Sequence, residues 1–440
     1  MKKRLLATLL SSTLVMTSLA GCSSKSENGD MVTELTKPIT IEMWHYMNGG
    51  QAEVLNEIIE DFNATNDKGI TVNAISQGSI VDLNKKVISA AQSNSLPAII
   101  NVYPDVATGL IEDKKLVNLS SFINDKNVGM ADEMDDFVDT FIEETSQWNN
   151  GEVYGLPMTK STEVLYVNKN MLESLGYTLE DLEDLTFEKL AEISNKAVTE
   201  LGVAGFGFDS SSNAFISSLK MDGLDFVDSK GTINVDNEWV REYMTFFQKQ
   251  AESGAFRIAG EDKFLSNPFV NQKMLCYQGS SAGYAYLNND GAFEIAVVEV
   301  PVFEGKDKAV IQQGASLFVT NNVSAEAQYA AYEFVKFATN AENTAKFATA
   351  TGYLPVRKSA IETEIVKNIL NDETSLYSQV YNVAQKSLPY AYYTPAINNA
   401  QSARTVAQEK YEAFMSGSIT DVEVLVDDIV SQVQTSIGRN

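Results

Sequence analysis

Hydrophobic and polar positions repeat with two alternating periods in the first part of the chain. Residues 39–44, Ile-Thr-Ile-Glu-Met-Trp, alternate with period two, which predicts a β-strand, and residues 70–75 and 98–103 predict two more. Between these strands, residues 51–62 and 81–92 place apolar side chains at three- and four-residue intervals, which predicts helices. This β-α-β-α-β order predicts an α/β fold with a parallel sheet covered by helices on its faces.

The positions at the ends of these predicted strands are rich in polar and aromatic residues. Ligands of open α/β sheets bind beyond the carboxyl ends of the strands. We therefore expect ligand-binding side chains at Trp44, His45, Tyr46, Gln77 and Asp105.

The rest of the chain continues as a mixed α/β pattern. The Asn150-Gly151 pair predicts a tight turn within residues 148–157. Further strands are expected at 163–168, 273–278, 293–299 and 315–320, and further helices at 187–201 and 239–251, from Ser324, and at 340–349. Residues 352–355 interrupt the helical pattern, and the remaining residues up to the carboxyl terminus are mainly helical in pattern.

The amino terminus has the pattern of an export signal. Lys2-Lys3-Arg4 precedes a short apolar run that ends in Leu19-Ala20-Gly21-Cys22, which is typical of a secretory signal peptide. The pattern resembles a bacterial lipoprotein signal, in which the thiol of Cys22 carries lipid; an ordinary signal peptide with an incidental cysteine is the alternative. We expect a signal peptide over 1–21, a flexible polar spacer over 22–37, and an extracytoplasmic protein that a lipid on Cys22 anchors to the cell membrane.

The composition of the chain limits the classes of partner that it can bind. The chain has 440 residues and a formal net charge of −26, and this acidity argues against a nucleic-acid partner. After the leader, no apolar stretch is long enough to span a membrane. If Cys22 carries lipid, Cys276 has no partner for a disulfide, and we expect it to be a buried thiol.

Motifs for catalysis are incomplete. Residues 279–283 match the G-x-S-x-G pattern of a nucleophilic serine, but the single histidine, His45, precedes this motif, whereas hydrolases of that fold place it afterwards. Two other interpretations remain: small residues at a helix start that receive a polar or anionic ligand, and a plain tight turn. One histidine and two cysteines also leave a zinc site without its usual ligands. We expect no catalytic residue, no metal and no cofactor.

Residues 390–395, Tyr-Ala-Tyr-Tyr-Thr-Pro, form an aromatic segment that does not fit a helix interior. A tyrosine ring in a loop suits stacking on a sugar, because it offers an apolar face and a polar tip. Tyr393 is therefore a candidate ligand contact, although packing in the core is equally compatible with the pattern.

Seven segments together resemble the solute-binding proteins of bacterial ABC importers, including those for glycerol 3-phosphate and maltose. They occur in the family's order at residues 44–45, 96–103, 154–157, 161–169, 279–281, 314–319 and 351–355. The resemblance covers roughly residues 39–440. It implies a two-lobed periplasmic-binding-protein-like fold of type II, whose discontinuous lobes close around a ligand by bending at a hinge. The implied lobes are residues 38–156 plus 308–352, and residues 157–307 plus 353–440.

The resemblance also implies ligand contacts at Ser161, at Ser280 or Ser281, at Gly314 and at Tyr353. Other positions of glycerol-phosphate binders are not matched. Ile80 stands where a tyrosine is expected, and residues 210–213 lack an expected tryptophan.

The arginine that would grip a phosphate is expected near Pro395, but the chain has none between Arg357 and Arg404. A phosphate without a bidentate arginine lacks its best charge-assisted partner, and Lys160 could replace it only in part. We therefore predict a neutral carbohydrate, of oligosaccharide size, with glycerol 3-phosphate or a glycerophosphodiester as the alternative.

Hydroxyl groups of such a ligand are expected to pair with Asp105, Glu163 and Asp209. The implied partners are the transmembrane permease subunits of the importer, and the protein is expected to be a monomer that does no chemistry. Two other classes remain: an extracellular glycoside hydrolase, since 59 acidic residues leave room for a catalytic pair, and a sensor or adhesin with the same fold.

Overall fold

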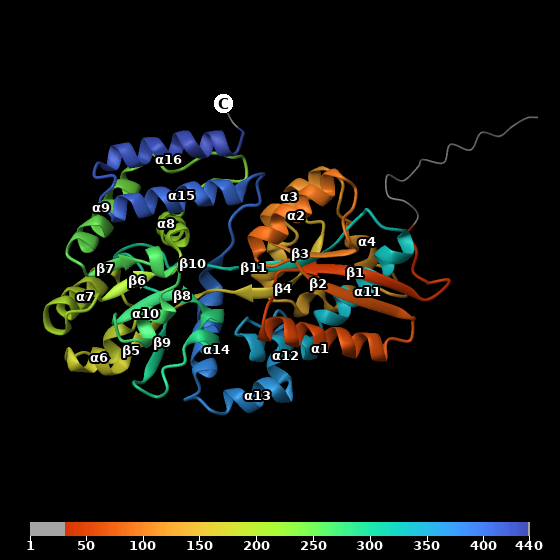
Figure 1. Ribbon diagram of the computed structural model, residues 1–440, viewed down its shortest axis with the longest axis horizontal. Helices are drawn as coiled ribbons and strands as arrows, with labels where there is room; N and C mark the ends of the chain where they lie inside the picture. Colours follow the sequence, from red (N-terminus) through yellow and green to blue (C-terminus); the bar gives the residue numbers. More distant parts are fainter. Residues whose placement is uncertain (1–30, 439–440) are drawn as a thin grey trace, which may run out of the picture.

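The computed structural model describes residues 31–438. The predicted signal peptide, the lipid site at Cys22 and most of the predicted spacer lie outside the described residues. Within them the chain forms two five-stranded sheets, each covered by helices, and one two-stranded sheet. Figure 1 shows the first sheet with β1, β2 and β3 on the right and the second sheet with β5 to β9 on the left.

The first sheet has the order β2-β1-β3-β11-β4. Its strands are β1 (Ile39–His45), β2 (Ile70–Ser76), β3 (Ile99–Val102), β11 (Gln313–Val319) and β4 (Gly155–Ser161). β1 pairs with β2 and β3 in parallel, as the alternating pattern predicts, whereas β11 runs antiparallel to β3 and β4. The sheet is mixed because the chain reaches β11 on its way back from the second sheet.

Helices cover both faces of this sheet, and together with the sheet they form what is called the first half below; the second half is built on the second sheet. These helices are α1 (Gly50–Thr65), α11 (Ala325–Ala338) and α12 (Ala341–Thr351) on one side, and α2 (Ile80–Gln92) and α3 (Pro104–Glu112) on the other. Met43 of β1 packs in the cluster that holds Leu55 of α1, and its neighbour Trp44 packs in the cluster that holds Leu83 of α2. The period-two pattern of β1 thus supplies one apolar side chain to each face.

The second sheet has the order β7-β6-β8-β5-β9. Its strands are β7 (Phe256–Ile258), β6 (Phe206–Phe208), β8 (Cys276–Ser280), β5 (Glu163–Asn168) and β9 (Ile295–Val298). The larger core contains α7 (Phe187–Leu201), α8 (Ser211–Lys220), α9 (Glu238–Glu252), α15 (Ala400–Met415) and α16 (Val422–Ser436), while α10 (Ser266–Val270) and α14 (Leu376–Ser387) pack in the smaller one. Cys276 is a free, buried thiol in the larger core.

Shorter elements complete the chain. The remaining α-helices are α4 (Ser120–Ile123), α5 (Asp139–Glu144), α6 (Lys169–Ser174) and α13 (Glu364–Leu370). The 3₁₀ helices are η1 (Ala131–Asp136), η2 (Leu179–Leu182), η3 (Gly260–Asp262), η4 (Ser281–Tyr286), η5 (Lys358–Glu362) and η6 (Leu388–Tyr390). Within residues 31–438, none of the helices combines the length and the apolar content that crossing a bilayer requires.

Two strand segments join the half of the chain that holds the first sheet to the half that holds the second. β4 continues into β5 through Thr162, and β10 (Val310–Ile311) continues into β11 through Gln312. Residues 352–355 run beside β4, where the Leu354 N–H donates to the Lys160 carbonyl at 2.7 Å, and η5 and α13 after them still pack against α12 of the first half. The chain returns to the second half at α14, which packs against β9. β12 (Ala391–Tyr392) adds to β10 in parallel.

The boundaries of the two lobes remain a prediction. The packing concerns the boundary predicted after residue 352, because Leu354 and Val356 beyond it still lie in a core cluster of the first sheet.

Gly314 gives a direct test of how tightly the crossing segments pack. Its φ is +124°, and a Cβ atom there would lie 1.7 Å from the carbonyl oxygen of Thr159. We expect Gly314→Ala to lower the free energy of unfolding by about 3 kcal/mol or more, measured by chemical denaturation. Gly50→Ala is the control, because a Cβ at this first residue of α1 meets nothing within 4 Å and should leave stability unchanged or raised. Equal stability of the two variants would contradict the close approach.

Candidate functional site

Tyrosine side chains meet at one end of the first sheet. Tyr46 follows β1, Tyr103 follows β3, and Tyr353 lies in the segment 352–355 beside β4. The Tyr46 hydroxyl is 3.4 Å from the Tyr353 hydroxyl and 3.1 Å from the Thr159 hydroxyl. All three tyrosines are half-buried, and burial raises the pKa of each, so their hydroxyls stay protonated at neutral pH. They offer ring faces with polar tips at one edge of the sheet.

A carboxyl and a guanidinium interact beside these tyrosines. Asp105 lies in the first turn of α3, and Arg404 projects from α15 of the other half. Burial raises the pKa of Asp105, while the N–H of Val106 and the charge of Arg404 oppose that rise. The same two charges act on Tyr103. Charged groups from both halves therefore converge on the tyrosine cluster.

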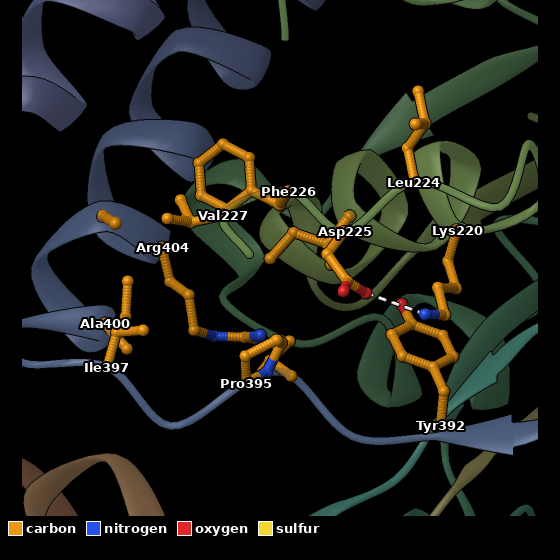
Figure 2. A pocket seen from close by; sticks show the side chains of 13 residues that line it. Lys220, Leu224, Asp225, Phe226, Val227, Tyr392, Pro395, Ile397, Ala400 and Arg404 are labelled. Atoms are coloured by element: carbon orange, nitrogen blue, oxygen red, sulfur yellow. Dashed lines mark hydrogen bonds and ion pairs between the residues drawn. The ribbon is translucent and has the colours of Figure 1, made fainter. Parts of the chain in front are cut away.

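Arg404 is a site residue that the sequence pattern does not reveal. It follows Pro395 by nine positions along the chain, yet Pro395 and Arg404 line the same small cavity. Figure 2 shows the Arg404 side chain reaching from its helix toward Pro395, with the ion pair of Lys220 and Asp225 and the ring of Tyr392 farther along. Arg404 thus brings a guanidinium close to Pro395 from the first turns of the next helix. Only the position of α15 in the fold reveals it.

A hydrogen-bonded network fixes the guanidinium. Arg404 Nη2 donates to Asn213 Oδ1 and lies 3.4 Å from Ser212 Oγ. Asn213 Nδ2 donates to Glu163 Oε1 at 2.6 Å and to Gln313 Oε1 at 2.9 Å.

Glu163 is the buried centre of this network. Gln278 Nε2 donates to its second oxygen at 2.7 Å. Burial raises the pKa of Glu163, whereas the amides of Asn213 and Gln278 and the charge of Arg404 lower it. Through Gln313 of β11, the network ties the second half to the first sheet.

Asp209 and the serine motif lie on the second sheet. Asp209 follows β6, accepts the Leu265 N–H at 2.6 Å, and lies so close to Gly279 that a Cβ there would be 2.8 Å from its Oδ2. Burial raises the pKa of Asp209 to about 6.

The serines of the G-x-S-x-G motif are engaged with the backbone. Ser281 is fully buried; its N–H donates to the Thr162 carbonyl at 2.7 Å and its hydroxyl accepts the Thr162 N–H at 3.3 Å. The Ser280 hydroxyl accepts the Ala282 N–H. His45 lies on β1 of the other sheet, where its Nδ1 accepts the Met47 N–H, so the motif has no histidine base beside it. This geometry favours the tight-turn interpretation.

Several of the predicted contacts lie away from this cluster. Trp44 and His45 are still inside β1 and are 8% and 3% exposed, and Trp44 packs against α2. Gln77 bonds to Lys86, and Tyr393 lines a separate groove near Glu143. Ser161, in contrast, is buried at the end of β4 opposite Gln313, which belongs to the Asn213 network. As ligand contacts, all of these stay predictions.

Lys160 cannot serve as a phosphate ligand in this arrangement, contrary to the expectation that it could replace an arginine in part. Its side chain is 0% exposed, and its ammonium pairs with Glu144 and donates to the Gly314 carbonyl at 3.1 Å. Burial raises the pKa of Glu144, and Lys160 and Gln312 oppose that rise. Among residues 31–438, no group of three or more His, Cys, Asp and Glu side chains is placed to hold a metal ion.

Comparison with known proteins points to one family. A family model described as bacterial extracellular solute-binding protein matches residues 57–372. The sn-glycerol-3-phosphate-binding periplasmic protein UgpB of Rhizobium meliloti is 23% identical over 414 residues, which span 90% of this chain and 94% of that protein. UgpB of Escherichia coli K12 is 23% identical over 400 residues, 88% of this chain and 90% of that protein.

Solved structures share the fold at lower identity. The ABC substrate-binding protein of Listeria monocytogenes in complex with cycloalternan has a TM-score of 0.78 at 16% identity and covers 92% of this chain and 100% of its own. UgpB of Mycobacterium tuberculosis in complex with glycerophosphocholine has a TM-score of 0.77 at 20% identity, covering 92% of this chain and 99% of its own. The predicted two-lobed α/β fold and the family resemblance are both confirmed.

Asp209 should make stability depend on pH in a definite direction. Its pKa is about 6 in the folded protein and 3.8 as the ordinary value, so between these pH values the folded state binds more protons than the unfolded state. Stability from this group is therefore greatest at low pH and is lost as pH rises toward 6, by on the order of 2 kcal/mol. We expect Asp209→Asn to lose less stability than the unmodified protein between pH 4.5 and 7 in urea titrations.

The control for Asp209 is Asp113→Asn at the exposed end of α3, which should keep the unmodified pH profile. If Asp209→Asn follows the unmodified profile as well, burial does not perturb Asp209.

Proposed function

Because the chain belongs to the bacterial extracellular solute-binding proteins, we propose that it captures a neutral carbohydrate of oligosaccharide size between its two lobes and delivers it to the permease of an ABC importer. One observation carries this proposal. The carboxyls of Asp105 and Glu163 interact with the guanidinium of Arg404 beside half-buried tyrosines, and the carboxyl of Asp209 interacts with Glu163. Carboxylates accept hydrogen bonds from hydroxyl groups, and ring faces suit the apolar faces of sugars.

The same arrangement supports capture by closure. Asp105 and Tyr46 belong to the first half, Arg404 and Asp209 to the second, and the segments through Thr162 and Gln312 cross between the halves. A ligand that contacts both halves in the closed form stabilises that form, and the permease then responds to it. The proposed lobe division keeps the predicted boundaries except at residues 353–370, which pack with α12 and the core of the first lobe.

Glycerol 3-phosphate or a glycerophosphodiester is the second candidate, and Arg404 is the observation that favours it. A guanidinium can hold a phosphate through two parallel hydrogen bonds. Here Arg404 Nη2 is already engaged by Asn213, and the carboxyls of Asp105 and Glu163 repel an anion. The neutral ligand therefore fits the surrounding charge better.

The family consists of binding proteins, and we propose that this member returns its ligand unchanged. A glycoside hydrolase would instead consume an oligosaccharide, which chromatography of the recovered ligand detects. We further propose a monomer outside the cytoplasm, held at the membrane by a lipid on Cys22. The relatives' family assignment supports the extracytoplasmic location, and the leader sequence supports the lipid.

A thermal-shift screen of residues 23–440 tests the ligand class. We expect maltose, maltotriose or a cyclic glucose oligosaccharide to raise the melting temperature, because a ligand that binds only the folded state stabilises it. Glycerol 3-phosphate and glycerophosphocholine serve as the anionic set. A shift with the anionic set alone would replace the carbohydrate proposal with the second candidate.

Two charge variants distinguish the two candidate ligand classes by whether binding becomes weaker or stronger. For a neutral sugar, Asp105→Asn and Arg404→Gln should each weaken binding about 10- to 100-fold in calorimetry, since each removes a charge-assisted hydrogen bond. For a phosphate ligand, Arg404→Gln should weaken binding strongly, whereas Asp105→Asn should strengthen it by removing a repulsive charge. Asp113→Asn on α3 is the matched control and should bind like the unmodified protein.

The lipid anchor is tested by Cys22→Ala. We expect the unmodified protein in the membrane fraction and the variant in the soluble extracytoplasmic fraction, because a lipid chain holds the protein by burying its methylene groups. Cys276→Ala is the control and should stay in the membrane fraction, since this thiol is buried in the second half. A Cys22→Ala protein that stays with the membrane contradicts the lipoprotein proposal.

A further inference from the structure

A groove of about 870 Å³ lies outside the cluster of Tyr46, Asp105 and Arg404, none of which lines it. Ligand pockets usually measure about 300–1,000 Å³, so the groove has the volume of a ligand site. One wall is formed by Thr140 and Glu143 of α5, which packs against β4 of the first sheet. The other is formed by Tyr381 and Gln385 of α14, which packs against β9 of the second sheet, and by Tyr393 after β12. The groove thus spans both halves.

A buried layer separates this groove from the ligand cleft. Glu144, paired with Lys160, interacts electrostatically with Asp105 on the cleft side and with Tyr393 on the groove side. Gln312 of the second crossing segment fills the same layer, where its amide bonds twice to Thr140. A molecule in the groove therefore meets Glu143, Tyr381 and Tyr393, none of which lines the cavity beside Arg404. The groove and that cavity share four lining residues at their border, Lys220, Asp225, Tyr392 and Pro395.

The groove holds polar groups that form no hydrogen bond within the described chain. The carboxylate of Glu143, the side-chain amide of Gln385 and the hydroxyls of Tyr381 and Tyr393 make no hydrogen bond or ion pair within residues 31–438. Tyr381 and Tyr393 also bring aromatic rings to the groove. Hydrogen-bond acceptors and donors beside aromatic rings are the groups that bind compounds rich in hydroxyls.

The cations around the groove are already neutralised. Arg357 bonds to the Thr339 carbonyl and pairs with Glu133, and Lys358 pairs with Asp139. Lys220 pairs with Asp225 at 2.7 Å. An anion in this groove would meet Glu143 without an unpaired cation among these lining residues to offset it, so the groove disfavours anions.

We propose that this groove is a second binding site, for a neutral polyhydroxy compound of about disaccharide size. The site takes an occupant of its own, in addition to the ligand in the cleft. Because an occupant touches α5 of one half and α14 of the other, it favours one angle between them. By linkage, its binding changes the affinity of the cleft for its own ligand, and the cleft ligand changes groove affinity by the same factor.

The test uses the full chain carrying Asp105→Asn and Arg404→Gln, so that binding in the cleft is weakened. Sucrose, maltose and maltotriose are titrated by ligand-observed NMR and calorimetry. We expect at least one of them to bind saturably, and Glu143→Gln or Tyr393→Ser added to this background to weaken that binding at least ten-fold. Gln385→Ala, on the surface of α14, is a further variant that does not disturb the core.

Tyr177→Ser is the matched control, since this half-buried tyrosine lies among Lys189 and Lys196, away from the groove, and should leave the binding unchanged. The proposal is overturned if none of the three sugars binds saturably up to its solubility limit. It is also overturned if a bound sugar is held equally well after Glu143→Gln and Gln385→Ala. Neither result bears on binding in the cleft, which is measured separately in the chain with Asp105 and Arg404 intact.

Discussion

The buried ion pair of Lys160 and Glu144 is the constraint on which the rest of the structure depends. Removing both charges from water is costly, and the pair is tolerated only where further hydrogen bonds hold its geometry. Here Lys160 also donates to the Gly314 carbonyl of β11 and, through its own carbonyl, accepts the Leu354 N–H. One residue therefore joins β4, β11 and residues 352–355, the segment that carries Tyr353.

The regular strands and helices could be predicted from the sequence because their apolar residues recur at the positions that are buried. Met43 and Trp44 pack on opposite faces of the first sheet, and the helices that cover it repeat their apolar positions toward those faces. The same packing explains which site predictions lack support. β1 continues to His45, so Trp44 and His45 belong to the strand, and the chain leaves the sheet only at Tyr46. A hydrophobic pattern predicts the presence of a strand more reliably than it predicts the strand's last residue.

Other parts of the site could not be read from the sequence because they depend on contacts between distant segments. Arg404 and Asp105 lie almost three hundred positions apart, and Asn213, which fixes Arg404, stands where the resemblance leads one to look for a tryptophan. The sequence suggested that Lys160 is free to bind an anion, because no local pattern indicates that Glu144 is its buried partner. The balance of charge in the cleft is therefore a property of the fold.

The position of Arg404 near the end of the chain has a consequence for biosynthesis. Both sheets are complete in sequence once β11 has been made, and the tyrosine cluster is complete with Tyr353. The guanidinium arrives later, on α15, which must dock against α8 and α3 to present it. During synthesis, the tyrosine cluster is thus made before its guanidinium, and a chain that has not yet delivered its final helices has the scaffold without Arg404.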